Sequence, residues 1–240
     1  MCAATGAARG RRSGWRWVVG VLTGTAGVTY SSWVLEFFLP GGPNPVTSFL
    51  SELAEPDRQF AWVYSVGDTV TGVLAVVAGI VGLLVFRRRR LTVVGWGGLV
   101  AFGAATMADA RLPLHRCRPD PCPHVDYGLF PQLHQIHALT STLAVISIFL
   151  VMIVGTAAGI RYGRREPRRD AGLWILVLAS VVTVWMLVAD NLPGDYVLGV
   201  AQRIQVAGMS VWLVLAGVRI CRAERLVAGA KTGTTGMVGT

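Results

Sequence analysis

All four histidines of this chain lie within one short stretch, His115, His124, His134 and His137, and Asp109 stands just before them. His134 and His137 are three positions apart where an apolar run begins, so on a helix they share a face. Imidazoles and carboxylates together suit zinc, which makes His134, His137 and Asp109 candidate zinc ligands. The alternative is that these histidines are solvated loop residues with a structural or pH-sensing role.

Two ionisable residues interrupt long apolar runs. Asp68 and Arg203 each follow the start of their run by seven residues, so two helices would place them at similar depth. A charge within a membrane span is costly and is a functional hypothesis by default. We predict that Asp68 pairs with Arg203, and that Glu36, Asp109 and Asp190 form the rim of a polar cavity above them. The alternative is an ion-pair network that only fixes helix packing.

The elements that position these residues are apolar stretches long enough to cross a bilayer. The chain is 53% hydrophobic and 15% charged, with a mean hydropathy of +0.54, which is typical of membrane proteins. Six runs of spanning length are separated by charged or Pro- and Gly-rich segments, and they cover residues 17–39, 61–86, 91–108, 137–160, 171–189 and 196–218. The sequence therefore predicts an all-α, six-helix transmembrane bundle with membrane lipid around it.

The basic residues predict the orientation of this bundle. Most of the 22 lysines and arginines fall on one side of the six runs, at Arg9, Arg11, Arg12, Arg16, residues 87–90, residues 161–169, Arg219, Arg222, Arg225 and Lys231. Positive charge concentrates in cytoplasmic loops, so both termini are predicted to be cytoplasmic. Because these charges lie between apolar runs, the net charge of +9 does not indicate nucleic-acid binding. The dominance of arginine over lysine suggests a bacterial protein, and hence the bacterial cytoplasmic membrane.

An acid followed by Leu-Pro recurs at the outer ends of the first, third and fifth runs. The three copies are Glu36 to Pro40, Asp109 to Pro113 and Asp190 to Pro193. They predict three repeated helical hairpins, although Leu-Pro after an acid is also an ordinary way to end a helix. We divide the chain into a basic cytoplasmic segment (1–16), the transmembrane domain (17–219) and a flexible cytoplasmic tail (220–240).

Several short motifs occur together in a fixed order. Ser51-Glu-Leu-Ala54 is followed by Gly67-Asp-Thr-Val-Thr-Gly72, by Leu112-Pro-Leu114 leading to Cys117 and Cys122, and by His137 at the start of the fourth run. In this order the chain resembles the bacterial membrane family catalogued as domain of unknown function 998, over roughly residues 18–220. The resemblance implies a multi-helix membrane fold and carries no substrate, reaction or catalytic residue with it.

These features leave three functional hypotheses. The first is a non-enzymatic membrane protein with an outward-facing polar cavity, acting as a sensor or an accessory protein of the cell envelope. The second is a metal-dependent intramembrane hydrolase that uses the His and Asp cluster of the second outer loop. The third is a small transporter coupled through Asp68 and Arg203, although no Pro or Gly break in mid-span offers an unwound binding site.

The four cysteines divide between the two sides of the membrane. Cys2 and Cys221 fall on the side of the termini, while Cys117 and Cys122 lie five positions apart in the second outer loop. In an oxidising compartment this spacing favours a disulfide between Cys117 and Cys122. Metal binding by the same two thiols is the alternative.

We therefore predict that Cys117 and Cys122 resist thiol labelling until a reductant is added. In intact cells a membrane-impermeant maleimide should then label both residues, because their loop is external. Cys2 and Cys221 serve as the internal control, since they should label only after permeabilisation. Labelling of Cys117 and Cys122 without reductant would refute the disulfide, and labelling only after permeabilisation would refute the orientation.

Overall fold

The computed structural model describes residues 2–112, 133–163, 166–189, 191–192 and 196–235, and the side chains of 14–112, 136–163, 166–189, 191–192 and 196–223. Within this part the chain is helical and contains no strand. The α-helices are α1 (Cys2–Thr29), α2 (Ala61–Val85), α3 (Arg90–Arg111), α4 (Leu133–Gly163), α5 (Ala171–Ala189) and α6 (Leu198–Thr235). Three short 3₁₀ helices are η1 (Ser32–Phe37), η2 (Leu50–Ala54) and η3 (Pro167–Arg169).

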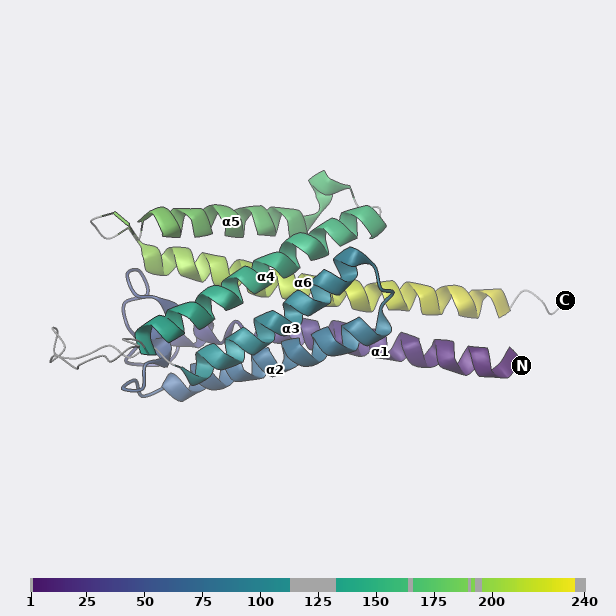
Figure 1. The fold of residues 1–240 in the computed structure, drawn as a ribbon, viewed down its shortest axis with the longest axis horizontal. Helices are drawn as coiled ribbons and strands as arrows, with labels where there is room; N and C mark the ends of the chain where they lie inside the picture. Colours follow the sequence, from purple (N-terminus) through teal and green to yellow (C-terminus); the bar gives the residue numbers. More distant parts are fainter. Residues whose placement is uncertain (1, 113–132, 164–165, 190, 193–195, 236–240) are drawn as a thin grey trace.

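The six long helices run roughly parallel or antiparallel along one direction (Figure 1). Both termini lie at the same end, which we call the terminal end, and α1 and α6 extend side by side beyond the other helices there. The segment from η1 to η2 lies at the opposite end, which we call the loop end. Helix α1 packs between α2 and α6, α3 packs between α2 and α4, and α5 packs on α6. Helix α4 touches α5 and α6 only slightly.

All six helices are long and apolar enough to cross a membrane, which confirms the predicted six-helix bundle. Their large apolar side chains point outward. On α2 an exposed stripe recurs every three or four residues, at Val66, Val70, Val73, Val77, Ile80 and Leu84, whereas the buried face carries Thr71, Gly72, Ala75, Ala78, Gly79 and Gly82. Water would disfavour such a stripe, but lipid solvates it. The chain is a multi-pass membrane protein.

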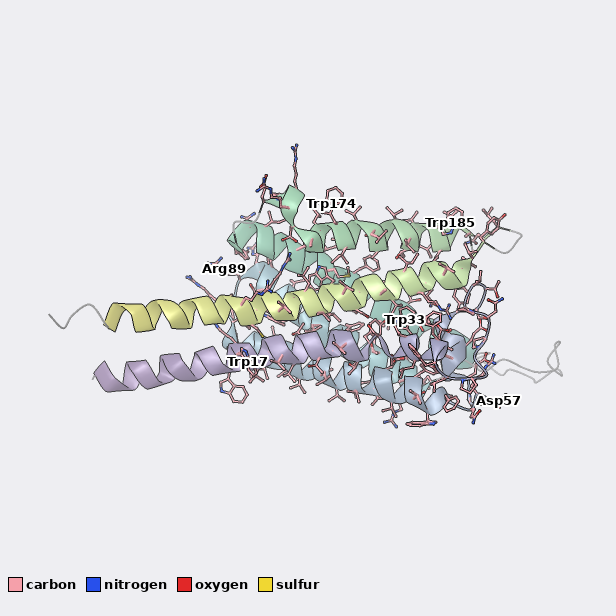
Figure 2. All side chains as sticks on the ribbon, turned by 180° about the vertical axis from the view of Figure 1, so that it is seen from behind. Trp17, Trp33, Asp57, Arg89, Trp174 and Trp185 are labelled. Atoms are coloured by element: carbon pink, nitrogen blue, oxygen red, sulfur yellow. The ribbon has the colours of Figure 1, made fainter. Side chains whose placement is uncertain are left out.

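The tryptophans occupy two levels of the bundle (Figure 2). Trp17 and Trp174 lie toward the terminal end, while Trp33 and Trp185 lie toward the loop end. Trp17, Trp174 and Trp185 are exposed at their surfaces. Amphipathic indole rings concentrate where the hydrocarbon meets the headgroups, so the two levels fit the two faces of a bilayer.

Glycines allow the closest helix contacts. A Cβ atom on Gly20 of α1 would lie 2.6 Å from the Cys221 sulfur on α6, and one on Gly217 of α6 would lie 2.5 Å from the Gly20 carbonyl oxygen. Between α2 and α3, a Cβ atom on Gly72 would lie 2.6 Å from the Gly103 carbonyl oxygen. Because real Cβ atoms essentially never lie at such distances, these backbones can approach each other this closely only at glycine.

The helix bounds differ from the sequence-based ranges at both termini and in the first span. The first predicted run, 17–39, is not one α-helix, because α1 ends at Thr29 and η1 follows. The hydroxyls of Thr29 and Ser31 bond back to carbonyls of α1, an arrangement that often bends or ends helices. Helices α1 and α6 continue through the predicted terminal segments to Cys2 and Thr235. The domain limits and the three-hairpin repeat stay predictions.

At the terminal end Asp170 caps α5. Its Oδ1 accepts hydrogen bonds from the backbone N–H groups of Gly172 at 2.8 Å and Leu173 at 3.3 Å, and from the Arg219 guanidinium at 3.1 Å. Burial by itself raises the pKa of Asp170, but Arg219 and the two N–H groups outweigh burial, so the pKa lies below its ordinary value. The carboxylate therefore joins the start of α5 to α6.

Replacing Asp170 with Ala should cost about 0.5–2 kcal/mol at pH 7, because the cap is lost. A carboxylate with a lowered folded-state pKa stabilises the protein above its unfolded pKa of about 3.9 and loses that contribution as pH falls through the folded value. The stability difference between wild type and Asp170→Ala should therefore shrink below about pH 4. Thermal midpoints in detergent across pH measure this difference.

The matched control is Glu166→Gln, which removes a carboxylate that pairs with Arg169, and both of these side chains are exposed. This change should leave the thermal midpoint nearly unaltered, since exposed ion pairs contribute little. A difference between wild type and Asp170→Ala that is the same at every pH would contradict the charged-cap interpretation.

Candidate functional site

Arg203 and Glu36 form a two-pronged ion pair near the loop end. The Nε and Nη2 atoms of Arg203 each donate to one carboxylate oxygen of Glu36, both at 2.6 Å. The two residues are 6% and 9% exposed, respectively. Parallel N–H···O bonds of this kind are strong and fix the relative orientation of both groups. The pair joins the start of α6 to η1.

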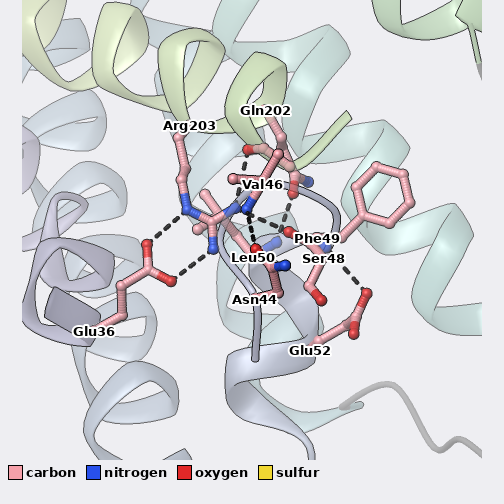
Figure 3. A network of polar contacts seen from close by, with 10 residues as sticks. Glu36, Asn44, Val46, Ser48, Phe49, Leu50, Glu52, Gln202 and Arg203 are labelled. Atoms are coloured by element: carbon pink, nitrogen blue, oxygen red, sulfur yellow. Dashed lines mark hydrogen bonds and ion pairs between the residues drawn. The ribbon is translucent and has the colours of Figure 1, made fainter. Parts of the chain in front are cut away.

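The third nitrogen of Arg203 binds the loop between η1 and η2 (Figure 3). Nη1 donates to the Ser48 carbonyl at 2.8 Å and to the Gly199 carbonyl at 2.9 Å. The loop is held further by Gln202, whose side-chain oxygen accepts from the Leu50 N–H at 2.6 Å. A Cβ on Gly199 would lie 2.6 Å from the Ser48 carbonyl oxygen, so the loop rests directly on the backbone of α6.

The predicted pairing of Arg203 with Asp68 is wrong. That prediction assumed an unbroken first helix, which would carry Glu36 up to the membrane boundary. Because α1 gives way to η1, Glu36 is instead buried and reaches the guanidinium. Glu36 is therefore the partner of Arg203.

A second polar feature lies beside this pair, a cavity of about 120 Å³ lined by Tyr30 and by residues of η1, η2, α2, α3, α4 and α6. We call it the acidic cavity, because Asp68 and Asp109 line it and none of its described lining residues is an arginine or lysine. Its other polar lining residues are Tyr30, Ser32, Trp33, Ser51, Tyr64, Thr106, His137, Ser141, Gln202 and Gln205. Of the four predicted cavity residues that the structure describes, Asp68 and Asp109 line this cavity.

Hydrogen bonds hold Asp109 in place. Its Oδ1 accepts from the hydroxyls of Thr140 at 2.6 Å and Ser141 at 2.7 Å, and lies 3.2 Å from Nδ1 of His137. The same Nδ1 lies 2.8 Å from the Leu112 carbonyl oxygen. These contacts tie the end of α3 to the start of α4. Asp109 is consequently a fixed acceptor whose Oδ1 is already occupied.

Asp68 differs from Asp109 in this respect. Within the described part of the chain, no hydrogen bond or ion pair reaches the Asp68 carboxylate, although the residue lines the same cavity. The neighbouring Thr71 hydroxyl bonds to Gly67 and to Thr29 instead. A half-buried carboxylate without a donor among the described residues is costly in a membrane protein, and this carboxylate faces the acidic cavity.

The remaining predicted site residues lie outside the described residues. These are the side chain of His134 and residues Asp190, Cys117 and Cys122. The described residues contain no group of three or more His, Cys, Asp or Glu side chains that could hold a metal ion. With the side chain of His134 outside this set, the zinc site stays a prediction, as does the disulfide.

Sequence reasoning missed several contributors to the site. Tyr30, Tyr64 and Gln205 line the cavity, and Gln205 also donates to the Thr183 hydroxyl of α5 at 2.6 Å. The available signal was their polarity within apolar runs, because amides in spans usually bond across helices. Ser48 gave no signal, since it contributes a backbone carbonyl.

The Arg203–Glu36 contact predicts a specific pattern of stabilities. Arg203→Leu or Glu36→Leu alone leaves the other charge buried without its partner and should lower the free energy of unfolding by about 3–5 kcal/mol. The double variant should recover much of that loss. Because the double variant should cost less than either single variant, the coupling energy from this double-mutant cycle should exceed about 3 kcal/mol. Unfolding of detergent-solubilised protein measures it.

The control is the same cycle with Asp68 in place of Glu36. Because Asp68 has no bond to Arg203, the effects of Asp68→Leu and Arg203→Leu should add. Strong coupling in the Asp68 cycle and none in the Glu36 cycle would contradict the geometry described above.

Comparison with known proteins agrees with this architecture and assigns no substrate or reaction to the chain. The family model described as Protein of unknown function (DUF998) matches residues 23–219. No curated protein and no solved structure matches the chain. The match includes every described residue of the acidic cavity and both members of the Arg203–Glu36 pair. The chain belongs to the DUF998 family, as its motifs predicted.

Proposed function

We propose that this chain is a non-enzymatic protein of the bacterial cytoplasmic membrane that binds a small cation in the acidic cavity. It would act as a sensor or an accessory protein of the cell envelope. Both termini are cytoplasmic in this proposal, so the loop end and its cavity belong to the extracytoplasmic side. The asymmetry of arginine between the two ends supports that orientation.

The observation that carries the proposal is the Asp68 carboxylate. It lines the acidic cavity without a hydrogen bond or ion pair from any described residue, in a chain where Glu36 and Asp170 both have cationic partners. Ionisable groups in spans face cavities and mark ligand or ion pathways. A bound cation would neutralise Asp68 where the protein supplies no charge.

The size and lining of the cavity also support a chemical class for the ligand. A volume of about 120 Å³ is somewhat smaller than a cavity of roughly 150 Å³ that holds benzene, so the ligand has few heavy atoms. Tyr30, Trp33 and Tyr64 contribute aromatic rings beside the carboxylates. Carboxylates and aromatic faces together recognise ammonium groups. A small organic ammonium ion fits this combination of size, charge and lining.

The polar contacts around Asp109 argue against a serine nucleophile. The Ser141 hydroxyl donates to Asp109 at 2.7 Å, while its distance to Nε2 of His137 is 3.4 Å. Ser141 is thus a positioning group for Asp109.

A second candidate function is a metal-dependent hydrolase that uses His134, His137 and Asp109. One observation favours it, the distance of 3.2 Å between Nδ1 of His137 and Oδ1 of Asp109, because carboxylates commonly orient metal-binding histidines. Stoichiometric zinc in purified protein, lost when His134 and His137 are both replaced by Ala, would favour this function over the first.

The first proposal is tested with methylammonium chloride on detergent-solubilised protein. Methylammonium should raise the thermal midpoint of wild type relative to sodium chloride at equal ionic strength, because a ligand that binds only the folded state stabilises it. Asp68→Asn should abolish that increase. In the absence of methylammonium, Asp68→Asn should itself stabilise the protein by about 1–3 kcal/mol, since it removes a half-buried charge that has no donor among the described residues.

Asp57→Asn is the matched control. Asp57 is an exposed acid at the same end of the bundle, so its replacement should preserve the methylammonium effect. Equal methylammonium shifts in wild type and Asp68→Asn, or a loss of stability in Asp68→Asn without the ligand, would overturn the proposal.

A further inference from the structure

A larger cavity lies toward the terminal end, away from the acidic cavity. It has a volume of about 390 Å³ and is enclosed by α1, α3, α4 and α6 together with Phe86. Volumes of about 300–1,000 Å³ are usual for binding sites of small molecules. The cavity exists because α4 touches α6 only slightly, and because Gly95, Ala158, Gly159 and Ala216 contribute little side chain to its walls.

The lining of this cavity is apolar except at one end. Leu99, Val151 and Trp212 line its inner part, while Arg16 and Arg219 line it nearer the terminal end. Among the described lining residues, these two arginines are the charged ones and none is acidic. Arg219 also donates to Asp170. The cavity therefore combines an apolar body with a cationic mouth.

The depth of the cavity matches one leaflet of a bilayer. Its wall on α3 runs from Leu91 to Leu99, which is about 12 Å at a rise of 1.5 Å per residue. The hydrocarbon core of a bilayer is about 30 Å thick, so one leaflet contributes about 15 Å. An extended apolar chain that enters at the terminal end would fill the cavity without crossing the midplane.

Aromatic contacts hold the mouth in shape. The Arg16 guanidinium lies 5.2 Å from the centre of the Phe86 ring, and that ring lies 5.2 Å from the ring of Trp96. On the opposite wall, Trp212 donates to the Thr156 hydroxyl at 3.2 Å, and a Cβ on Gly155 would lie 2.5 Å from the Trp212 ring. Both walls are thus fixed by packing, and Arg16 is held at the mouth by a ring.

We propose that this cavity binds one acyl chain of an anionic phospholipid from the leaflet on the side of the termini, with the lipid phosphate at Arg16 and Arg219. The apolar walls recognise the chain, and the two guanidiniums recognise the phosphate, which arginine binds in a forked geometry. The site is separate from the acidic cavity, which has the opposite charge and lies at the loop end. The protein would therefore bind a structural or regulatory lipid independently of any ligand of Asp68.

Native mass spectrometry of the full chain tests this proposal. The detergent-solubilised protein is incubated with an equimolar mixture of phosphatidylglycerol and phosphatidylcholine that have identical acyl chains. Wild type should retain one lipid, with phosphatidylglycerol preferred. Arg16→Gln should lower that preference about fivefold, because one basic residue near a membrane surface contributes about 1 kcal/mol to binding an anionic lipid. Ala158→Phe should abolish lipid retention, because the ring fills the cavity.

Two matched controls separate the cavity from the surrounding surface. Arg222→Gln removes an exposed arginine of the same end that does not line the cavity, and Ile153→Phe adds a ring at an exposed position of α4. Both should behave as wild type. Glycerol 1-phosphate, which has the phosphate and no acyl chain, should fail to displace the lipid.

Three results would overturn the proposal. They are a phosphatidylglycerol preference unchanged in Arg16→Gln, lipid retention by Ala158→Phe equal to that of Ile153→Phe, and displacement of the lipid by glycerol 1-phosphate, which would indicate a phosphate site alone. If Ala158→Phe does not fold, the comparison of Arg16→Gln with Arg222→Gln decides the question.

Discussion

The buried pair of Arg203 and Glu36 is the contact on which the loop end depends. Removing two charges from water is costly, and such a pair persists only where geometry and further hydrogen bonds are good. Here the carboxylate receives two short bonds, and the remaining guanidinium nitrogen reaches two carbonyls. The pair thereby joins η1, the following loop and α6. Two of these joined elements line the acidic cavity, η1 through Trp33 and α6 through Gln202.

Packing in the rest of the bundle follows the chemistry of its solvent. Lipid accepts large apolar side chains as readily as the protein interior does, so the helices associate through small residues and a few polar contacts. Gly20, Gly72, Gly103 and Gly217 let the backbones of neighbouring helices meet. Where small residues face one another without such contact, as around Ala158 and Ala216, space remains. The same composition thus produces both the tightest contacts and the larger cavity.

The two cavities lie at opposite ends of the bundle, and the charged residues that line them have opposite signs. At the loop end Asp68 and Asp109 line a small polar space, while at the terminal end Arg16 and Arg219 line a larger apolar one. Their contents should therefore differ in both charge and size. A small cation at one end and an anionic lipid at the other would each bring a charge opposite to that of the lining groups.

The sequence by itself determined the six spans, because a helix that crosses lipid must satisfy its backbone internally and expose apolar side chains over about 20 residues. It also singled out Glu36, Asp68, Asp109 and Arg203, since charge within apolar runs is conspicuous. Only the tertiary structure decided which of these residues meet. The break between α1 and η1 turns Glu36 toward Arg203 and leaves Asp68 beside Asp109. Hydropathy reports the length of a span and not the path of its backbone, so one local change of helix type was enough to exchange the partners.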